Sequence, residues 1–487
     1  MPSEIVEAFD KLRRDQPERK LVYLPARGEA LSTVDIWECA TRIRHTLRTA
    51  GVGRGALILS AVGSHPAALA ILLACRDESL SLLPVDGGTT TQEITAAAAA
   101  FGARVAIVPE GRELPGFANP VSIQPGLVVV RSGLESATPL HSAAVLKLTS
   151  GSTGLPRAAL TPESALVGDG TTLAAAMDIK PTDVQIAAIP LSHSYALGNL
   201  VMPLLLHGTA IVLRDGFVPQ RIPDDAHAFH ARHLPGVPYM FEHFATHPPV
   251  GGWPPSLTRL ISAGALLKGE TAERFRQTFG VKIHSFYGTS ETGGIAFDDS
   301  DAAVADGMVG SALPGVNITL RPDRATEPTL GRVHVKSCAL STGYAGADDS
   351  DAFCDSGFLT GDIGHMDHAG QLTLIGRVST FVNVAGRKVQ TDEVERTLRE
   401  FPGLTDVRVF GVDDQRRGEQ LVACVAFASL PPSVVELRRF CGVRLAVHKI
   451  PRVFVFVPKI PVSARGKTDR AQLERLARAE IVRAGML

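Results

Sequence analysis

Residues 148–157 read Leu-Thr-Ser-Gly-Ser-Thr-Gly-Leu-Pro-Arg, and an apolar, strand-like run, Ala143 to Leu148, leads into them. Glycines let backbone N–H groups point into a concave nest, while four hydroxyls and the Arg157 cation add further donors. Such a loop fits a polyphosphate. It is not a P-loop, because no Gly-Lys pair closes it. The alternative interpretation is a Ser/Gly surface loop between two strands.

Composition narrows the class of protein. A chain of 487 residues has room for about three domain-sized units. Lys+Arg of 49 against Asp+Glu of 50 leaves no basic field that would favour nucleic acid or an anionic membrane, so we expect a small-molecule partner. The six cysteines form no C-x-x-C pair and are expected to be reduced thiols. No signal peptide is visible and the longest small-apolar run, Ala67 to Cys75, is too short to span a bilayer, which predicts a cytoplasmic protein.

Helical and strand-like segments alternate along the first two-thirds of the chain. The helix that begins at Ser32 or Thr33 should end at Gly51, and the apolar run Ala56 to Val62 is typical of a strand covered on both faces. The first series continues with a helix at 65–75, a strand at 80–85, a helix at 91–101 and a strand at 105–108. The second has a helix at 162–177, a strand at 184–189, an apolar helix at 195–206, strands at 210–213, 257–261 and 283–286, and a helix at 270–279. This alternation predicts two doubly wound α/β lobes.

The pattern changes twice more toward the C-terminus. From about Gly307, short strands at 317–320, 332–336, 364–366 and 372–374 predict a small β-rich subdomain. Beyond Arg377 the pattern predicts a compact α+β unit of about a hundred residues, with strands at 381–384, 407–412, 421–427 and 453–457 and helices at 391–400 and 434–443. We therefore expect a large N-terminal domain over 1–376, a boundary segment at 377–380, and a small C-terminal domain over 381–487.

Three further stretches could carry chemistry. Residues 286–294, Phe-Tyr-Gly-Thr-Ser-Glu-Thr-Gly-Gly, offer a flat ring for a base and a carboxylate for Mg²⁺. Asp362 could accept hydrogen bonds from a ribose diol, and Arg377 supplies a guanidinium near the domain boundary. Lys467 lies in a glycine-hinged loop before the last helix. Taken singly, each is better explained as a buried aromatic or a solvated charge.

In this order and spacing, the stretches closely resemble the adenylate-forming superfamily, which contains acyl-CoA synthetases, adenylation domains of nonribosomal peptide synthetases and luciferases. The resemblance covers nearly the whole chain and is closest to a stand-alone acyl-CoA ligase. It implies that the domain over 1–376 binds ATP and an acid, and that 377–380 is the hinge of a mobile C-terminal domain over 381–487. It implies a phosphate-binding loop formed by Thr149, Ser150, Gly151, Ser152, Thr153 and Gly154, ending at Arg157. It also implies that Glu291 and Thr153 bind Mg²⁺ and that Asp362 and Arg377 bind the ribose hydroxyls.

The remaining roles follow from the same resemblance. Lys467 would bridge the acid and the α-phosphate, and His193 would border the acyl site; with Thr153 and Glu291 these are the expected catalytic residues. The remaining ATP-binding residues are expected to be Gly264, Ala265, Tyr287, Gly288 and Ser290, and the acid pocket is expected to be lined by His193, Ser194, Tyr195, Val237 and Gly264.

The chain departs from the family pattern at three positions. Arg157 stands where lysine is usual, Ser290 stands in place of threonine, and Ser379 occupies a hinge position that is commonly Asp or Lys. The first change keeps the charge and alters its geometry, the second retains the hydroxyl, and the third alters the electrostatics of the hinge.

The resemblance implies an AMP-forming ligase that uses ATP and Mg²⁺ to convert an organic acid into its acyl adenylate, and then transfers the acyl group to a thiol, for which we favour CoA. The alternatives are loading of a carrier protein through its phosphopantetheine thiol, activation of a non-carboxylate oxyacid, a luciferase-like oxygenase, and a non-catalytic ligand sensor. A homodimer is one option for the assembly. The sequence does not specify the acid.

Overall fold

A computed structural model of the chain describes residues 2–133, 143–149, 157–214, 216–322, 330–345, 350–377, 381–384, 387–414, 418–445, 449–461 and 468–483. The chain divides into two compact units. The first comprises Met1–Thr319, His334–Thr360 and Met366–Leu374, and the second comprises Leu320–Val333, Gly361–His365 and Ile375–Leu487. The strands β17 (Asn317–Arg321), β18 (Leu330–Lys336), β21 (Gly357–Met366) and β22 (Gln371–Arg377) contribute residues to both units. The short strand β20 (Phe353–Cys354) pairs with β21.

The first sheet of unit one has the predicted doubly wound character. Its order is β19-β9-β8-β4-β3-β5-β7-β6. The strands span Tyr344–Ala345 (β19), Arg157–Thr161 (β9), Val145–Thr149 (β8), Ser81–Pro84 (β4), Leu57–Ser60 (β3), Val105–Pro109 (β5), Leu127–Ser132 (β7) and Phe117–Gln124 (β6). The core strands β8, β4, β3 and β5 are parallel, as buried crossover strands require.

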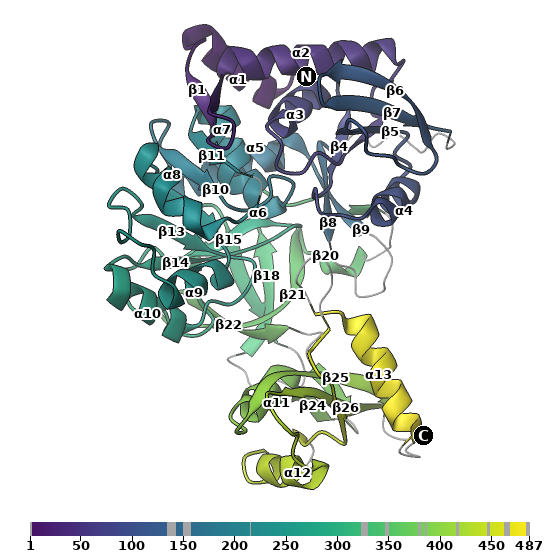
Figure 1. The fold of residues 1–487 in the computed structure, drawn as a ribbon, viewed down its shortest axis with the longest axis vertical. Helices are drawn as coiled ribbons and strands as arrows, with labels where there is room; N and C mark the ends of the chain where they lie inside the picture. Colours follow the sequence, from purple (N-terminus) through teal and green to yellow (C-terminus); the bar gives the residue numbers. More distant parts are fainter. Residues whose placement is uncertain are drawn as a thin grey trace. The chain divides into compact units, whose positions relative to one another are not determined.

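Helices cover both faces of this sheet (Figure 1). They are α2 (Thr33–Thr49), α3 (Ala67–Asp77) and α4 (Thr91–Phe101). Leu57 and Leu59 pack with α4, whereas Ile58 packs with α3, because successive side chains of a strand point to opposite faces. The expectation of strands covered on both sides is confirmed. Capping boxes begin α2 at Ser32 and α4 at Thr90.

The second sheet of unit one runs β16-β15-β14-β13-β12-β10-β11-β1-β2 over the strands that lie in this unit. They span Met308–Ala312 (β16), Gly293–Phe297 (β15), Ile283–Thr289 (β14), Arg259–Ser262 (β13), His233–Gly236 (β12), Val184–Ala187 (β10), Ala210–Leu213 (β11), Lys20–Leu24 (β1) and Glu29–Ser32 (β2). The accompanying helices are α1 (Glu4–Asp15), α5 (Glu163–Ala176), α6 (Ser194–Ala196), α7 (Met202–His207), α8 (Ile222–Ala228), α9 (Pro238–Thr246) and α10 (Gly269–Phe279). The change of pattern expected from about Gly307 coincides with β16, a strand that was not among those expected; it pairs with β15 and so extends this sheet.

The helix expected at 195–206 is not a regular α-helix. The segment Leu197–Val201 between α6 and α7 is a π-helix. Gln185 Nε2 donates to the carbonyl of Asn199 at 2.9 Å, and Asn199 Nδ2 donates to the carbonyl of Tyr195 at 3.3 Å. These bonds satisfy the Asn199 and Tyr195 carbonyl groups where the regular helical pattern is broken.

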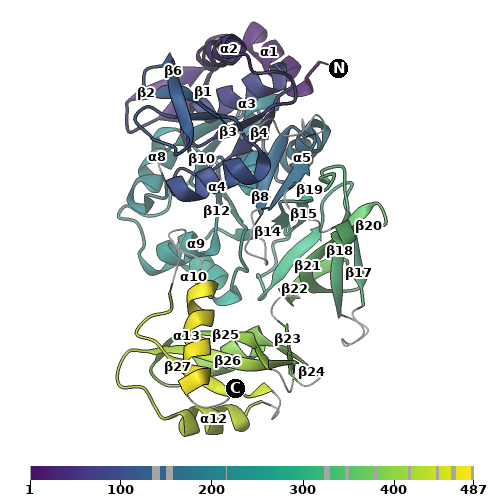
Figure 2. The same ribbon diagram turned by 90° about the vertical axis from the view of Figure 1, so that its right-hand side faces the viewer.

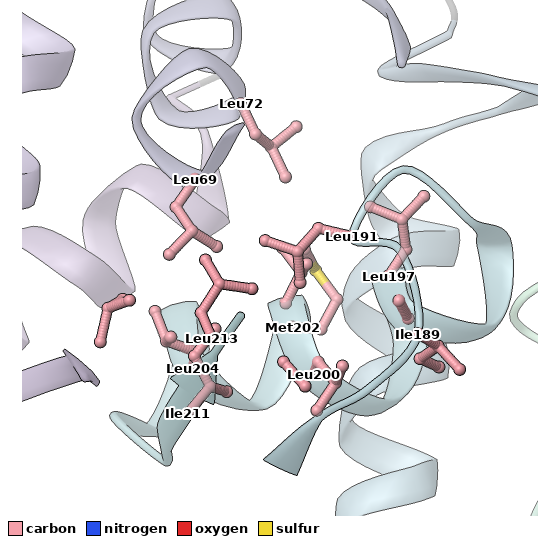
Figure 3. Close-up of a cluster of buried hydrophobic side chains, with 14 of the residues drawn as sticks. Leu69, Leu72, Ile189, Leu191, Leu197, Leu200, Met202, Leu204, Ile211 and Leu213 are labelled. Atoms are coloured by element: carbon pink, nitrogen blue, oxygen red, sulfur yellow. The ribbon is translucent and has the colours of Figure 1, made fainter. Parts of the chain in front are cut away.

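A single apolar cluster fixes this segment against the first sheet. Leu69 and Leu72 of α3 meet Leu191, Leu197 and the neighbouring side chains of 189–213 (Figure 3). The segment that carries His193 is therefore anchored on both sides in the packed apolar core.

Unit two contains the predicted α+β fold. Its sheet has the order β24-β23-β26-β25, with β27 paired to β26. The elements span Phe381–Val384 (β23), Arg387–Gln390 (β24), Thr391–Arg399 (α11), Leu404–Asp414 (β25), Gly418–Phe427 (β26), Val434–Gly442 (α12), Val453–Phe456 (β27) and Arg470–Arg483 (α13). Figure 2 shows α13 lying across this sheet. Val394 and Leu437, from α11 and α12, pack in one apolar cluster, and Leu473 of α13 packs in another on the other face.

Candidate active site

The predicted phosphate loop is the connection of a β-hairpin. The strands β8 and β9 are antiparallel, and their last pair joins Thr149 to Arg157. Arg157 Nε donates to Thr149 Oγ1 at 3.1 Å, so the two ends of the loop are tied by side chains as well as by the ladder. The loop residues themselves lie outside the described residues; they are Ser150, Gly151, Ser152, Thr153 and Gly154.

A series of side-chain contacts connects Arg157 to Tyr344, and Tyr344 to Glu291. The Arg157 guanidinium lies over the Tyr344 ring, with its carbon 4.6 Å from the ring centroid. Tyr344 Oη donates to Glu291 Oε1 at 2.7 Å. Strand β19 positions this tyrosine, because Tyr344 pairs with Ala159 of β9. The aromatic ring thus links the base of the phosphate hairpin to the proposed metal ligand, and arginine suits the stacked geometry better than lysine.

Glu291 lies in the tight turn between β14 and β15 and is 7% exposed. Thr289 Oγ1 accepts from the backbone N–H of Thr292 at 3.3 Å, and Ser341 N–H donates to the Glu291 carbonyl at 2.7 Å. These bonds fix the backbone of the turn. The hydrogen bond from Tyr344 uses only Oε1 of Glu291, so the tyrosine leaves the second carboxylate oxygen unused. Mg²⁺ is commonly held by one or two carboxylates together with substrate phosphates, and this donor set fits such a role.

The adenine candidates lie on the same strand and on its neighbour. Tyr287 is buried in β14, and Gly288 approaches the facing strand so closely that an added Cβ would lie 2.7 Å from the Gly293 carbonyl oxygen. After β13, Gly264 has φ +80°, a conformation that favours glycine, and Ala265 beside it is exposed.

The expected acid-pocket residues come together in two groups. An added Cβ at Gly264 would lie 3.6 Å from Val237 Cγ1, which places these two residues side by side. Ser194 Oγ lies 3.2 Å from Ser290 Oγ, so the histidine segment reaches the turn of Glu291.

His193 caps the short helix α6 and is exposed. Next to it, Tyr195 donates to the Ile261 carbonyl at 3.0 Å and packs on Phe286, with ring centroids 5.5 Å apart. Burial raises the pKa of the Tyr195 phenol. The Tyr195 phenol is therefore uncharged at neutral pH and held in place by these contacts, so we assign it no acid–base role.

The ribose candidates pair within unit two. Arg377 Nε donates to Asp362 Oδ1 at 2.7 Å, and the Asp362 side chain is largely buried while that of Arg377 is mostly exposed. The bond uses one oxygen of the carboxylate, which can accept further hydrogen bonds. The expected catalytic Lys467 and the hinge residue Ser379 lie outside the described residues.

Two charged residues near the site were missed by the sequence interpretation. Lys147 lies in the strand β8 that was described as apolar, and Asp169 lies on the buried face of α5; both side chains are 4% exposed. Asp169 Oδ1 accepts from Gly294 N–H at 2.8 Å. Burial lowers the pKa of the Lys147 ammonium, against the opposing charges of Asp169 and Glu291, and burial raises the pKa of the Asp169 carboxyl, against the charge of Lys147.

A sequence signal existed for both residues, and none existed for Tyr344. A lysine inside a buried strand is unusual. Asp169 lies four residues after Ala165 and four before Leu173, which places it on the same buried face of the helix. Tyr344 is distant in sequence from Glu291 and belongs to a strand of two residues.

The remaining chemistry-related features are few among the described residues. The described residues contain no cluster of three His, Cys, Asp or Glu side chains that could hold a metal. A Mg²⁺ ion at Glu291 would therefore take its other ligands from groups outside such a cluster, such as substrate phosphates. All six cysteines are free. Within the described part of the chain, no helix is long and apolar enough to cross a membrane.

Known families and proteins match most of this chain. The family model described as AMP-binding enzyme matches residues 9–345, and the AMP-binding enzyme C-terminal domain matches residues 393–467. A feruloyl-CoA synthase from an Amycolatopsis species is 27% identical over 473 residues, which cover 92% of this chain and 94% of the relative. A sulfoacetate–CoA ligase of Cupriavidus necator is 26% identical, covering 84% of this chain and 80% of the relative.

Solved structures share the fold. ATP-bound MatB from Rhodopseudomonas palustris superposes with a TM-score of 0.78 at 23% identity, covering 98% of this chain and 99% of that one. The o-succinylbenzoate CoA synthetase of Bacillus subtilis, solved with its acyl-adenylate intermediate, gives a TM-score of 0.80 at 19% identity, covering 97% and 98%.

Proposed function

This chain belongs to the AMP-binding enzyme family, and from that premise we propose that it is an AMP-forming acid–thiol ligase of the acyl-CoA synthetase type. It uses ATP and Mg²⁺ to activate an organic acid as its acyl adenylate, with release of pyrophosphate. CoA then takes the acyl group. The observation that carries the proposal is the Arg157–Tyr344–Glu291 series, which joins the base of the phosphate hairpin to a carboxylate suited to Mg²⁺.

The first half-reaction needs charge stabilisation more than covalent chemistry. The acid's oxygen attacks the α-phosphorus, and the bond to the pyrophosphate oxygen breaks. Fixed donors and cations that already face the phosphates stabilise the developing charge without reorganising. We assign this task to the hairpin hydroxyls, to Arg157 and to Lys467. Glu291 would hold the Mg²⁺ ion, which neutralises phosphate charge when bound.

The nucleoside and the acid are assigned to the residues around these groups. Tyr287, Gly264 and Ala265 would flank the adenine, and Asp362 with Arg377 would bind the ribose hydroxyls. For the acid we propose a pocket bordered by His193, Ser194, Tyr195 and Val237. The bond from Tyr195 to the Ile261 carbonyl fixes one wall of that pocket. The domain organisation, with 1–376 binding substrates, a hinge at 377–380 and 381–487 carrying Lys467, belongs to the same proposal.

The relatives bear names of chemically different CoA ligases, from feruloyl-CoA to sulfoacetate, so the family alone does not select the acid. The test is Mg²⁺-dependent ATP–pyrophosphate exchange across a library of aryl, C2 to C18 and sulfonated acids. We expect one class to stimulate exchange, and CoA then to yield the thioester. Absence of exchange with every acid in folded protein would overturn the proposal. Exchange without CoA consumption, but with acylation of a phosphopantetheine carrier protein, would instead identify a carrier-loading enzyme.

We propose a cytoplasmic location and keep a homodimer as one option for the assembly. Free thiols at every cysteine support a reducing compartment such as the cytoplasm. Sedimentation of the purified chain would decide between a monomer and a homodimer.

A further inference from the structure

Lys147 is placed where a charged side chain is costly. Strand β8 lies inside its sheet, paired with β4 on one side and β9 on the other. Its neighbours Val145 and Leu146 belong to the hydrophobic core, and Lys147 itself is 4% exposed. A buried ammonium is tolerated only where opposite charge compensates its lost hydration. No step of the proposed reaction uses this side chain.

Asp169 supplies part of the opposite charge and contacts two elements that carry candidate site residues. Its Oδ1 accepts from Gly294 N–H at 2.8 Å, and an added Cβ at Gly293 would lie 2.4 Å from that oxygen. On the other side, an added Cβ at Gly198 would lie 2.7 Å from Asp169 Oδ2. The carboxylate is therefore enclosed between the hairpin that bears Glu291 and the π-helix that follows His193.

Two carboxylate charges act on the ammonium group of Lys147. The charges of Asp169 and Glu291 both act on Lys147 and oppose the effect of burial on its pKa. Glu291 precedes Gly293 in the same turn, so the Asp169 bond to Gly294 and the Lys147 charge act on the same few residues.

We propose that Lys147 and Asp169 are a pair of positioning residues for Glu291: Asp169 anchors the turn that carries it, and Lys147 balances the charge of both carboxylates. The inference rests on the proposed function for the role of Glu291 as the Mg²⁺ ligand. In this proposal both residues act through Glu291.

The two charges make opposite predictions. In Asp169→Asn the shape is retained but one of the two carboxylate charges that act on Lys147 is removed, so the charge of the lysine opposes a cation at Glu291. The Mg²⁺ concentration for half-maximal ATP–pyrophosphate exchange should rise about tenfold, as expected for an unbalanced charge in a partly dry site. In Lys147→Met the opposing cation is gone, so the same quantity should fall several-fold. The double variant should return to within about threefold of the parent, because the net charge of the three groups is then the same as in the parent.

A matched control separates this role from general destabilisation. Asp225 of α8 is also a buried carboxylate, paired with Arg214 at 2.7 Å. Asp225→Asn should lower Tm and leave the Mg²⁺ dependence unchanged. Single variants at 147 and 169 that shift the Mg²⁺ requirement in the same direction, or an Asp169→Asn variant within twofold of the parent, would overturn the charge-balance claim.

Hydrogen exchange tests the anchoring without any activity. In Asp169→Ala the Gly294 amide loses its acceptor, so a peptide spanning 286–297 should exchange at least tenfold faster than in the parent, while a peptide spanning 222–229 should not change. Unchanged protection at 286–297 would overturn the anchoring claim. If the parent shows no ATP–pyrophosphate exchange with any acid, the proposed function fails, and hydrogen exchange still decides whether Asp169 anchors the turn.

Discussion

The Tyr344 hydroxyl donates a 2.7 Å hydrogen bond to Glu291 Oε1, and the face of the same ring lies against the Arg157 guanidinium. One side chain therefore orients the proposed Mg²⁺ ligand and supports the cation at the base of the phosphate hairpin. The substitution of arginine for the usual lysine is explained by this contact, since a planar guanidinium stacks on an aromatic ring.

Tyr344→Phe keeps the ring and removes the hydrogen bond. A lost bond to a charged acceptor costs about 1.5 to 3 kcal/mol, so the Mg²⁺ requirement for ATP–pyrophosphate exchange should rise about tenfold or more. The matched control is Tyr23→Phe in β1, where the ring packs on Phe229 away from the hairpin. An unchanged Mg²⁺ requirement in Tyr344→Phe would show that the bond does not orient a metal ligand.

Asp362→Ala should weaken the use of ATP. If the carboxylate binds ribose hydroxyls, each lost bond costs about 1.5 to 3 kcal/mol, which should appear as a higher KM for ATP and a lower kcat/KM. Asp367→Ala is the control, because that exposed carboxylate binds the backbone N–H of Gln371 at 2.8 Å. Equal kinetic constants in Asp362→Ala and the parent would mean that Asp362 does not bind the nucleotide.

Acid should destabilise the protein through its buried histidines. Burial lowers the pKa values of His233 and His284, whereas in the unfolded chain both bind protons near pH 6.5. The unfolded state then binds more protons, so the free energy of unfolding should fall as the pH drops from 7 toward 5. The pKa of Asp183, lowered to about 2 against the effect of burial by its bonds to His233, the Lys180 N–H and Arg232, adds a loss below pH 4.

The measurement is Tm against pH for the parent and His284→Gln. The variant should have a shallower slope between pH 7 and pH 5, because one titrating group has been removed. Identical slopes would show that His284 does not contribute to the acid sensitivity.

Lys467→Ala should separate the two half-reactions. Removing one preorganised charge-stabilising donor typically costs about 10² to 10³-fold, and we expect that loss in adenylate formation. Thioester formation from a pre-made acyl adenylate should stay within several-fold of the parent in single-turnover kinetics. Lys459→Ala, at an exposed lysine upstream, is the control. A parallel fall in both steps would contradict a role confined to adenylation.

The fold could largely be predicted from the sequence because its local signals agree with each other. Continuous apolar runs identified the parallel strands, and capping residues such as Ser32 identified helix starts. The pairing of β1 with β11 through Val22 and Ile211 was not predictable, because it joins segments far apart in the chain. The π-helix was missed, and the bond that one of its carbonyls accepts comes from Gln185 of β10, outside the segment itself.

The site was predicted in part for the same reason. Turn chemistry around Glu291 and the apolar-to-glycine transition at Thr149 are local patterns. The Tyr344 contact depends on the register of β19 against β9, which no local pattern specifies. Lys147 and Asp169 interrupt the apolar pattern of their elements, and such an interruption is the sequence signal that indicates a buried charged residue.

Product analysis tests the central claim most directly. With ATP labelled at the α-phosphate, Mg²⁺, CoA and the acid selected by exchange, the account predicts AMP and acyl-CoA in equal amounts, with one pyrophosphate released per turnover. Glu291→Gln should reduce all three together by about 10²-fold or more, the size expected when a preorganised transition-state contact is lost. Formation of ADP and phosphate in place of AMP, or full activity in Glu291→Gln, would contradict the account.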